Sequence, residues 1–183
     1  MGDRVSYTRQ DLRPASIGKL DPDTLHPRAR ALIFLPDLVT DYIEAAFIEP
    51  IAVTCLSQET QSDLSISALE VDPGDRVVVR QSLIHGATTN RPFIHAEVHL
   101  VVSRVPAGLI RDLRDSTAGL GRLLDTHQVE HNREMLWYGA DTSNDLTAVL
   151  EGDTFAARRY RLVDAGVPLV TIVERFAVDL FGD

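Results

Sequence analysis

The last part of the chain alternates apolar and polar residues in the way that a β-strand requires. Every second residue here would share one strand face, and this set consists of Val170, Ile172, Glu174 and Phe176. Three of the four are apolar, which predicts that the face packs into a core. Arg158 to Val163 is predicted as the preceding strand, because residues 164–168 supply a glycine- and proline-containing turn between the two.

The middle of the chain predicts a second antiparallel hairpin. Arg76 to His85 and Phe93 to Ser103 have strand character, and residues 86–92 form a long tip between them. Ile51 to Leu56 is a further strand and Ile66 to Val71 a weaker candidate. For residues 129–138 both strand and helix remain open.

Helical spacing appears in two regions. Between Arg28 and Phe47 the pattern is broken at Pro36, and Thr40 is a candidate N-cap for the second of the two helices. Residues 106–124 are helical with an interruption at residues 116–119. Strands with tight connections and clustered helices predict an α+β fold with a mostly antiparallel sheet. Residues 1–27 hold three prolines and are predicted as a loosely ordered lead-in, followed by one domain at residues 28–183.

Two charged residues lie on predicted core faces. Glu174 shares its face with three apolar residues, and Arg80 alternates with Val78, Ser82 and Ile84 on the strand from Arg76. A buried charge costs several kcal/mol unless it is paired. Two such charges in a chain of 183 residues indicate a site for a small anionic ligand. A structural ion pair between Arg80 and Glu174 is the alternative.

Three more arginines, Arg158, Arg159 and Arg161, stand beside the last hairpin. One or two of them must share the sheet face of Glu174, but a slip of one residue at the turn changes which ones do. The alternative is that most of them point outward into solvent.

A possible metal-ligand set also has an ordinary explanation. His95, Glu97 and His99 fall on one face of a strand whose other face is apolar. No neighbouring segment offers a further ligand and a solvated outer face explains the three equally well, so we predict no metal site.

The composition of the chain excludes several classes of partner and of covalent cross-link. The formal net charge of −9 argues against a nucleic-acid surface or an anionic membrane as partner. Cys55 is the one cysteine, so no intrachain disulfide forms, and its apolar surroundings predict a buried, inert thiol. The chain lacks an apolar stretch of ~20 residues and a signal-peptide core, so we expect a cytoplasmic protein.

Serine-nucleophile, nucleotide-loop and metalloprotease signatures are absent. Gly119-Leu120-Gly121 lacks the third glycine of a dinucleotide loop and predicts a turn that opens a helix. The backbone N–H groups of Leu120 and Gly121 would nevertheless suit a carboxylate.

Several segments in this order resemble the chorismate lyase (chorismate pyruvate-lyase) family, particularly its actinobacterial-type branch. The similarity covers roughly residues 28–181, and its matching stretches are residues 39–50, 80–86, 118–124, 133–139 and 157–176. Any one of these stretches would be weak evidence for the resemblance, but five stretches in the same order are specific evidence.

The resemblance implies a single α+β domain whose antiparallel sheet carries helical flaps over an internal pocket. Members convert chorismate to 4-hydroxybenzoate and pyruvate without metal or organic cofactor. It further implies that Arg80 binds the ring carboxylate, that Glu174 meets the ring hydroxyl, and that main-chain groups at Val39 and Leu120 complete the carboxylate pocket. One of Arg158, Arg159 and Arg161 would hold the enolpyruvyl carboxylate. A monomer and a homodimer both remain open.

Two alternatives follow from the same fold. Relatives carry a Thr-Asp-Gly-Thr type of turn where this chain has residues 35–38, Leu-Pro-Asp-Leu, so a lyase for an amino analogue of chorismate is one alternative. The other is a non-catalytic module that binds a small aromatic acid, as in sensor domains of transcription regulators. The short N-terminal segment has no helix-turn-helix pattern, which favours the enzyme as an expectation.

Overall fold

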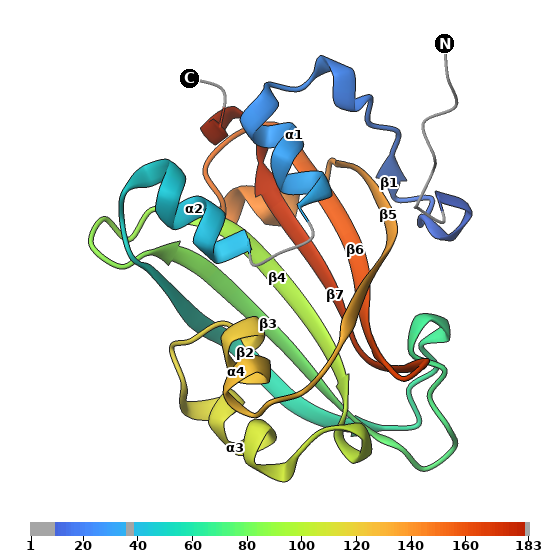
Figure 1. Cartoon of the computed structure of the whole chain (residues 1–183). Coiled ribbons are helices and arrows are strands. Elements are labelled where there is room, and N and C mark those ends of the chain that lie inside the picture. Colours follow the sequence, from blue (N-terminus) through green and yellow to red (C-terminus); the bar gives the residue numbers. More distant parts are fainter. Residues whose placement is uncertain (1–9, 36–38, 182–183) are drawn as a thin grey trace.

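The computed structural model describes residues 10–35 and 39–181. One antiparallel sheet runs through the molecule in the strand order β1-β5-β6-β7-β4-β3-β2 (Figure 1). Its strands are β1 (Ile17–Gly18), β2 (Ile51–Ser62), β3 (Arg76–Gly86), β4 (Pro92–Val101), β5 (Asn132–Asp141), β6 (Phe155–Asp164) and β7 (Val167–Ala177). The helices are α1 (Pro27–Phe34), α2 (Val39–Phe47), α3 (Ala107–Asp115) and α4 (Leu120–Thr126). Short 3-10 helices are Gln10–Leu12, Pro22–Thr24, Ser67–Leu69, Val102–Arg104, Asn144–Ala148 and Val178–Phe181.

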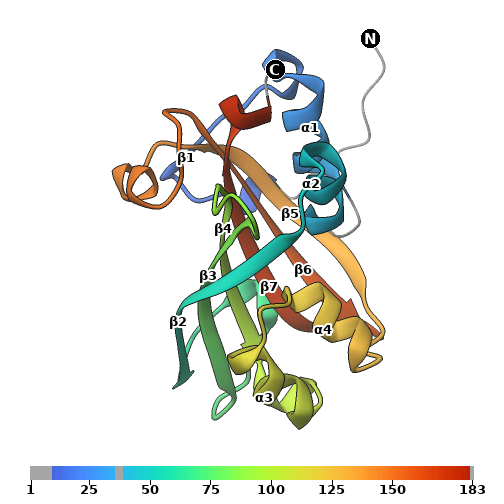
Figure 2. The same cartoon turned by 90° about the vertical axis from the view of Figure 1, so that its left-hand side faces the viewer.

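The four α-helices lie over the same face of the sheet (Figure 2). Helices α1 and α2 pack on one half of it, in a core cluster that includes Ile94 of β4 and Phe176 of β7. Helices α3 and α4 pack on the other half, in a cluster that includes Leu100 and Ile172. All of these strand residues have even numbers, as alternation along each strand requires for a shared face. The predicted α+β fold with one antiparallel sheet is confirmed.

Most predicted elements are present, with three differences of interest. Residues 132–141 form strand β5, where the sequence left strand and helix open. Residues 67–69 form a 3-10 helix rather than the weak strand predicted, because a tight turn buries Ala68 and Leu69 together. Helix α2 already begins at Val39, so Thr40 lies within its first turn and is not the N-cap. The preceding Leu-Pro-Asp-Leu turn falls partly on residues 36–38, outside the described residues.

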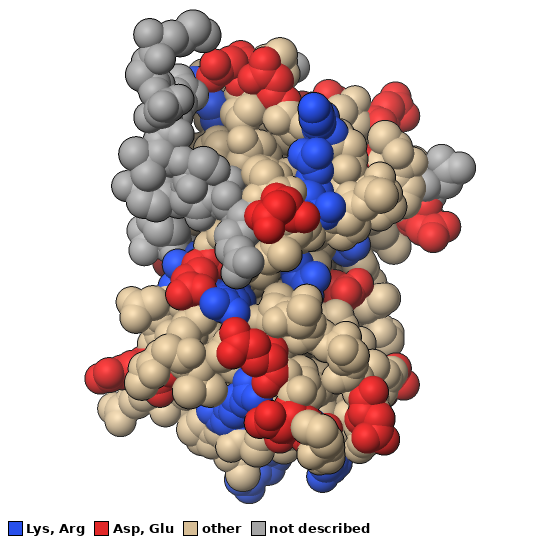
Figure 3. Space-filling view, turned by 90° about the vertical axis from the view of Figure 1, so that its right-hand side faces the viewer, with Lys and Arg blue, Asp and Glu red and all other residues tan. Residues whose placement is uncertain are grey.

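The predicted lead-in, residues 1–27, is described from residue 10 onward, and this described part adds a strand to the sheet. Strand β1 pairs with β5 at Ile17 and Asp141, and Ile17 is buried in a small cluster on the face opposite the helices. On the side of the molecule seen in Figure 3, acidic and basic side chains are interspersed rather than gathered by sign. Among the described residues, no helix is both long and apolar enough to cross a bilayer.

Candidate active site

A pocket lies between the two halves of the helical layer, where the core clusters under α1–α2 and α3–α4 do not meet. The empty space in it is about 760 Å³, a figure that includes the part open to solvent. The floor is the sheet and the walls are the first turns of α2 and α4. The lining residues are Val39, Thr40, Val53, Arg80, Ser82, Ile84, Ala96, Val98, Ala118, Gly119, Leu120, Gly121, Arg122, His131, Arg133, Tyr160, Leu162, Ile172 and Glu174.

Glu174 is a buried carboxylate held by two neighbours on β6. The sheet register sets it directly opposite Arg158, whose Nε donates to Oε2 at 2.7 Å. The Tyr160 hydroxyl donates to Oε1 at 2.8 Å. Because Glu174 is 4% exposed, these bonds supply the pairing that a buried acid needs. They leave further lone pairs on the carboxylate for a ligand in the pocket.

Arg158 lies behind this carboxylate rather than in the pocket wall. It is fully buried and also donates through Nη1 to the carbonyl oxygens of Leu32, Ile33 and Leu35. These carbonyls belong to the C-terminal end of α1, where backbone acceptors lack partners within the helix. The same arginine side chain therefore connects α1 to the sheet and fixes the position of Glu174.

Arg80 is a buried cation on β3 with neutral partners. Its Nε donates to Ser82 Oγ at 2.9 Å, and Nη1 donates to Gln58 Oε1 at 2.6 Å and to the Leu113 carbonyl at 2.5 Å. Within residues 10–35 and 39–181, no carboxylate lies within ion-pair distance of Arg80. Burial accordingly lowers the pKa of this guanidinium below its ordinary value, since desolvation penalises the charge. A buried arginine beside a pocket, without a counter-ion, is well suited to bind an anion.

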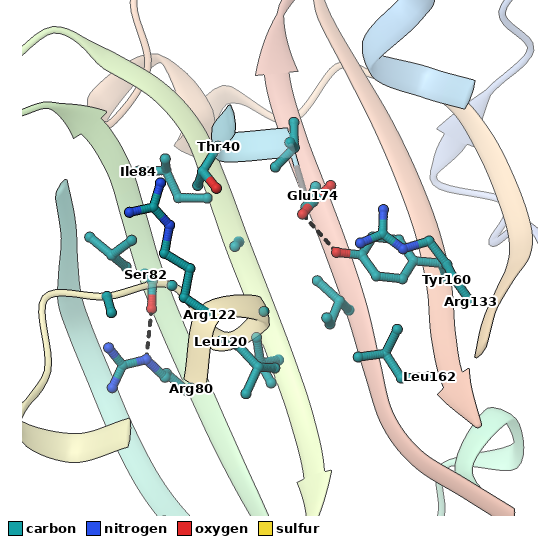
Figure 4. A pocket seen from close by; sticks show the side chains of 18 of the residues that line it. Thr40, Arg80, Ser82, Ile84, Leu120, Arg122, Arg133, Tyr160, Leu162 and Glu174 are labelled. Carbon is teal, nitrogen blue, oxygen red and sulfur yellow. Dashed lines mark hydrogen bonds between the residues drawn. The ribbon is translucent and has the colours of Figure 1, made fainter. Parts of the chain in front are cut away.

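Strand β4 separates the two charged residues and keeps the space between them open. Ala96 is the cross-strand neighbour of both Ser82 and Glu174, and Val98 that of Arg80. These small side chains form the floor between Arg80 and Glu174, which approach the pocket from opposite sides (Figure 4).

Two more arginines line the pocket. The Arg133 guanidinium lies 4.2 Å from the centroid of the Tyr160 ring, a cation–π contact, and donates to the Leu35 carbonyl at 3.3 Å. Arg122, on α4, donates to Asp41 at 3.1 Å and to Glu44 at 3.0 Å, both on α2. The Arg122 side chain is 48% exposed, so this bridge lies at the solvent end of the pocket.

Residues 38–181 match the protein family described as chorismate pyruvate-lyase Rv2949c-like. This chain belongs to that family. The match covers more than half of the chain and includes every residue that lines the pocket.

Curated relatives carry the same description. A chorismate pyruvate-lyase of Mycobacterium tuberculosis (strain ATCC 25618 / H37Rv) is 27% identical over 117 residues, and one of Mycobacterium bovis has the same identity over the same length. The matched region is 59% of this chain and 56% of each relative. The comparison thus spans little more than half the length of these lyases.

Solved structures that share this fold include a domain of a transcriptional regulator. The ligand-binding domain of a GntR-family transcriptional regulator from Bordetella bronchiseptica has a TM-score of 0.57 at 18% identity, covering 70% of this chain and 86% of that one. PhnF from Mycobacterium smegmatis has a TM-score of 0.64 at 13% identity, covering 78% and 64%. At these identities the likeness shows the fold alone.

Five of the residues predicted for a lyase site line the pocket, and three do not. Arg80, Glu174, Val39, Leu120 and Gly121 are lining residues. Val39 opens α2, while Leu120 and Gly121 open α4, where the first backbone N–H groups have no acceptor within the helix.

The three arginines of β6 have other partners. Arg158 pairs with Glu174, so the alternative of a structural ion pair between Arg80 and Glu174 does not hold: the direct neighbour across the sheet takes the carboxylate. Arg159 and Arg161 lie on the opposite face, where Arg159 donates to Thr171 and Arg161 to Glu134 and Glu70. Neither of these two reaches the pocket.

Sequence reasoning missed Tyr160 and Arg133. Tyr160 follows Arg158 by two residues, so strand parity puts both on the face of Glu174 once the register of the hairpin is fixed. Arg133 could not be placed while residues 129–138 had no assigned element. A strand there would have set Arg133 on the pocket face through its pairing with Leu162.

Two further expectations fail, one on the edge strand β2 and one on the second face of the sheet. Cys55 is exposed rather than buried, because β2 is an edge strand and Val53 is its one fully buried residue. His95 is buried rather than solvated, since the second face of the sheet is partly covered as well. Within the described residues, His95, Glu97 and His99 do not form a metal-ligand group.

Proposed function

We propose that this protein is a chorismate pyruvate-lyase that converts chorismate to 4-hydroxybenzoate and pyruvate. The observation that supports this best is that Arg80 and Glu174, from strands on either side of β4, line one buried pocket. The pocket thus has a buried cation on one side and a buried carboxylate on the other. The small side chains of the floor between them leave room for a ring. Membership of the chorismate pyruvate-lyase Rv2949c-like family supports the same substrate.

In the proposed complex Arg80 binds the ring carboxylate through charge-assisted hydrogen bonds. Glu174 accepts a hydrogen bond from the ring hydroxyl with the oxygen lone pairs that Arg158 and Tyr160 leave unused. The N–H groups of the first turns of α2 and α4, at Val39, Leu120 and Gly121, would assist at the carboxylate.

The reaction then needs one proton transfer and one bond cleavage. Glu174 takes the proton from the ring carbon that carries the hydroxyl group, and this electron pair completes the aromatic ring. The C–O bond to the enolpyruvyl group breaks, the leaving enolate takes up a proton at its CH₂ carbon, and pyruvate results. General-base catalysis and orientation in a dry site supply the acceleration.

The first test follows pyruvate release from chorismate by the purified protein. We expect turnover well above the uncatalysed rate, and Arg80→Met is expected to lower kcat/KM by about 10- to 100-fold, because a charged hydrogen bond of roughly 1.5–3 kcal/mol is lost. Glu174→Gln is expected to lower kcat by about 100-fold or more through loss of the base.

Two controls accompany this test. Arg111→Met changes an exposed arginine of α3 and should leave turnover unchanged. Circular dichroism checks each variant, because Glu174→Gln leaves Arg158 buried without its counter-charge. Absence of pyruvate above background from the folded wild-type protein would refute the proposal.

A binding module without turnover is the second candidate. It is supported by the similarity to the ligand-binding domain of a GntR-family regulator, although that likeness concerns the fold. Binding of 4-hydroxybenzoate that depends on Arg80, without pyruvate release from chorismate or from its amino analogue, would favour this candidate over a lyase.

A further inference from the structure

Strand β2 contains a β-bulge beside the buried arginine of the pocket. Cys55 lies opposite Ser82 on β3. The next pair is Ser57 with Gln81, which leaves Leu56 without a partner. A bulge adds one residue to its strand and so shifts the alternation of all the residues that follow. Such bulges are frequent beside active sites, where they redirect a side chain.

The extra residue sets Gln58 directly opposite Arg80. Without the bulge, the register that pairs Cys55 with Ser82 would place Ser57 there, and the serine side chain is shorter. Residues directly opposite each other have Cβ atoms about 4.5–5.5 Å apart, which is within reach of long side chains. Arg80 Nη1 accordingly donates to Gln58 Oε1 at 2.6 Å. The bulge therefore brings an amide oxygen to the guanidinium.

Gln58 completes a set of neutral acceptors around Arg80. Arg80 Nε donates to Ser82 Oγ, and Nη1 also donates to the Leu113 carbonyl. Besides burial, the pKa of Arg80 responds only to the Cys55 thiol within the described part of the chain. Arg80 Nη2 makes no hydrogen bond to any described residue, and Arg80 lines the pocket, so this part of the guanidinium is available to a ligand.

We infer that Gln58 is a positioning residue for the substrate: its neutral amide orients the Arg80 guanidinium and leaves the positive charge to the ring carboxylate. A carboxylate in its place would accept the same hydrogen bond and would also neutralise Arg80, because a partly buried ion pair is little screened. The residue type at position 58 thus decides whether the pocket takes an anion. The inference rests on the proposed function, since it takes the carboxylate of the ligand to lie on Arg80.

Gln58→Glu tests this inference, because it keeps the length of the side chain and adds a charge. We expect the Kd of 4-hydroxybenzoate, measured by calorimetry, to rise about 10-fold or more, since the new carboxylate competes with the ligand for Arg80. The preference for this acid over the neutral 4-hydroxybenzamide should shrink by the same factor. Tm should be unchanged or higher, because a buried charge gains a partner.

Gln58→Met separates the effect of charge from that of the hydrogen bond. It removes the acceptor and adds no charge, while Ser82 and the Leu113 carbonyl still hold Arg80. We expect a loss of affinity of about 3-fold, smaller than in Gln58→Glu. A purely structural role predicts the reverse order, because glutamate restores the hydrogen bond that methionine lacks.

Gln81→Glu is the matched control. It makes the same chemical change next to Arg80 in the chain, but Gln81 is exposed and alternation directs it to the other face of the sheet. The affinity for 4-hydroxybenzoate should stay at the wild-type value. A Gln58→Glu variant that binds this acid as tightly as the wild-type protein, or no more weakly than Gln58→Met, would overturn the inference.

Pyruvate release from chorismate, measured in parallel, separates this inference from the proposed function. Wild-type turnover together with full affinity in Gln58→Glu would overturn the inference and leave the lyase proposal standing. Binding of 4-hydroxybenzoate that is lost in Gln58→Glu, without pyruvate release by the wild-type protein, would support the inference and refute the lyase. A wild-type protein that binds no 4-hydroxybenzoate would overturn the inference whatever its turnover.

Discussion

At Glu174, charge and hydrogen bonding come from a single neighbouring strand. Arg158 and Tyr160 hold one carboxylate oxygen each, and both are buried with it. Burial raises the pKa of the Tyr160 hydroxyl above its ordinary value, and the nearby Glu174 charge adds to this. Tyr160 therefore stays protonated, and donates its hydrogen bond to Glu174, at every pH at which the folded protein is expected to act.

Tyr160→Phe tests this arrangement because it removes the hydroxyl and keeps the ring beneath Arg133. We expect kcat to fall roughly 10-fold, the equivalent of about 1–1.5 kcal/mol for one hydrogen bond, with KM changed little. Since the raised pKa keeps Tyr160 protonated, the pH profile of kcat should keep its shape in the variant. Loss of an alkaline limb in Tyr160→Phe would instead show that Tyr160 titrates during turnover.

At the scale of elements, the first turns of α2 and α4 form opposite walls of the pocket and are joined by Arg122. Its contacts with Asp41 and Glu44 bridge two helices that belong to different core clusters. An exposed bridge of this kind contributes little to stability, commonly about 0–1 kcal/mol. Its position between the two walls suits a role in ligand retention better than one in folding.

Arg122→Met is therefore expected to raise the dissociation rate of 4-hydroxybenzoate a few-fold and to shift Tm by no more than a few degrees. Stopped-flow displacement and thermal unfolding measure the two effects. Arg114→Met, an exposed arginine on the neighbouring α3, is the control. An unchanged dissociation rate together with a large drop in Tm would show that the bridge holds the fold instead.

The elements also show where prediction from sequence works. Two-residue alternation alone put Arg80 and Glu174 on core faces, and both are buried at 2% and 4% exposure. What alternation cannot give is strand order and register. Cys55 was mistaken for a core residue because nothing local marks β2 as an edge, and the partner of Glu174 depended on a pairing with Arg158 that a one-residue slip would change.

For the whole molecule, the pocket is a consequence of how the helices divide over one sheet. Each helix pair covers half of the face, and the strands continue beneath the gap with small residues such as Ala96 at its centre. The sequence predicted the helices and the strands, and the family resemblance predicted a pocket beneath helical flaps. That β5 contributes Arg133 to the pocket could be seen only from the pairing of β5 with β6 in the structure.

The central claim is that Arg80 and Glu174 act on the two ends of one aromatic ring. A crystal structure with 4-hydroxybenzoate bound tests it most directly. We predict the carboxylate of the ligand within hydrogen-bond distance of the Arg80 guanidinium and its hydroxyl group on Glu174. A ligand bound outside this pocket, or one in it whose carboxylate does not contact Arg80, would contradict the account.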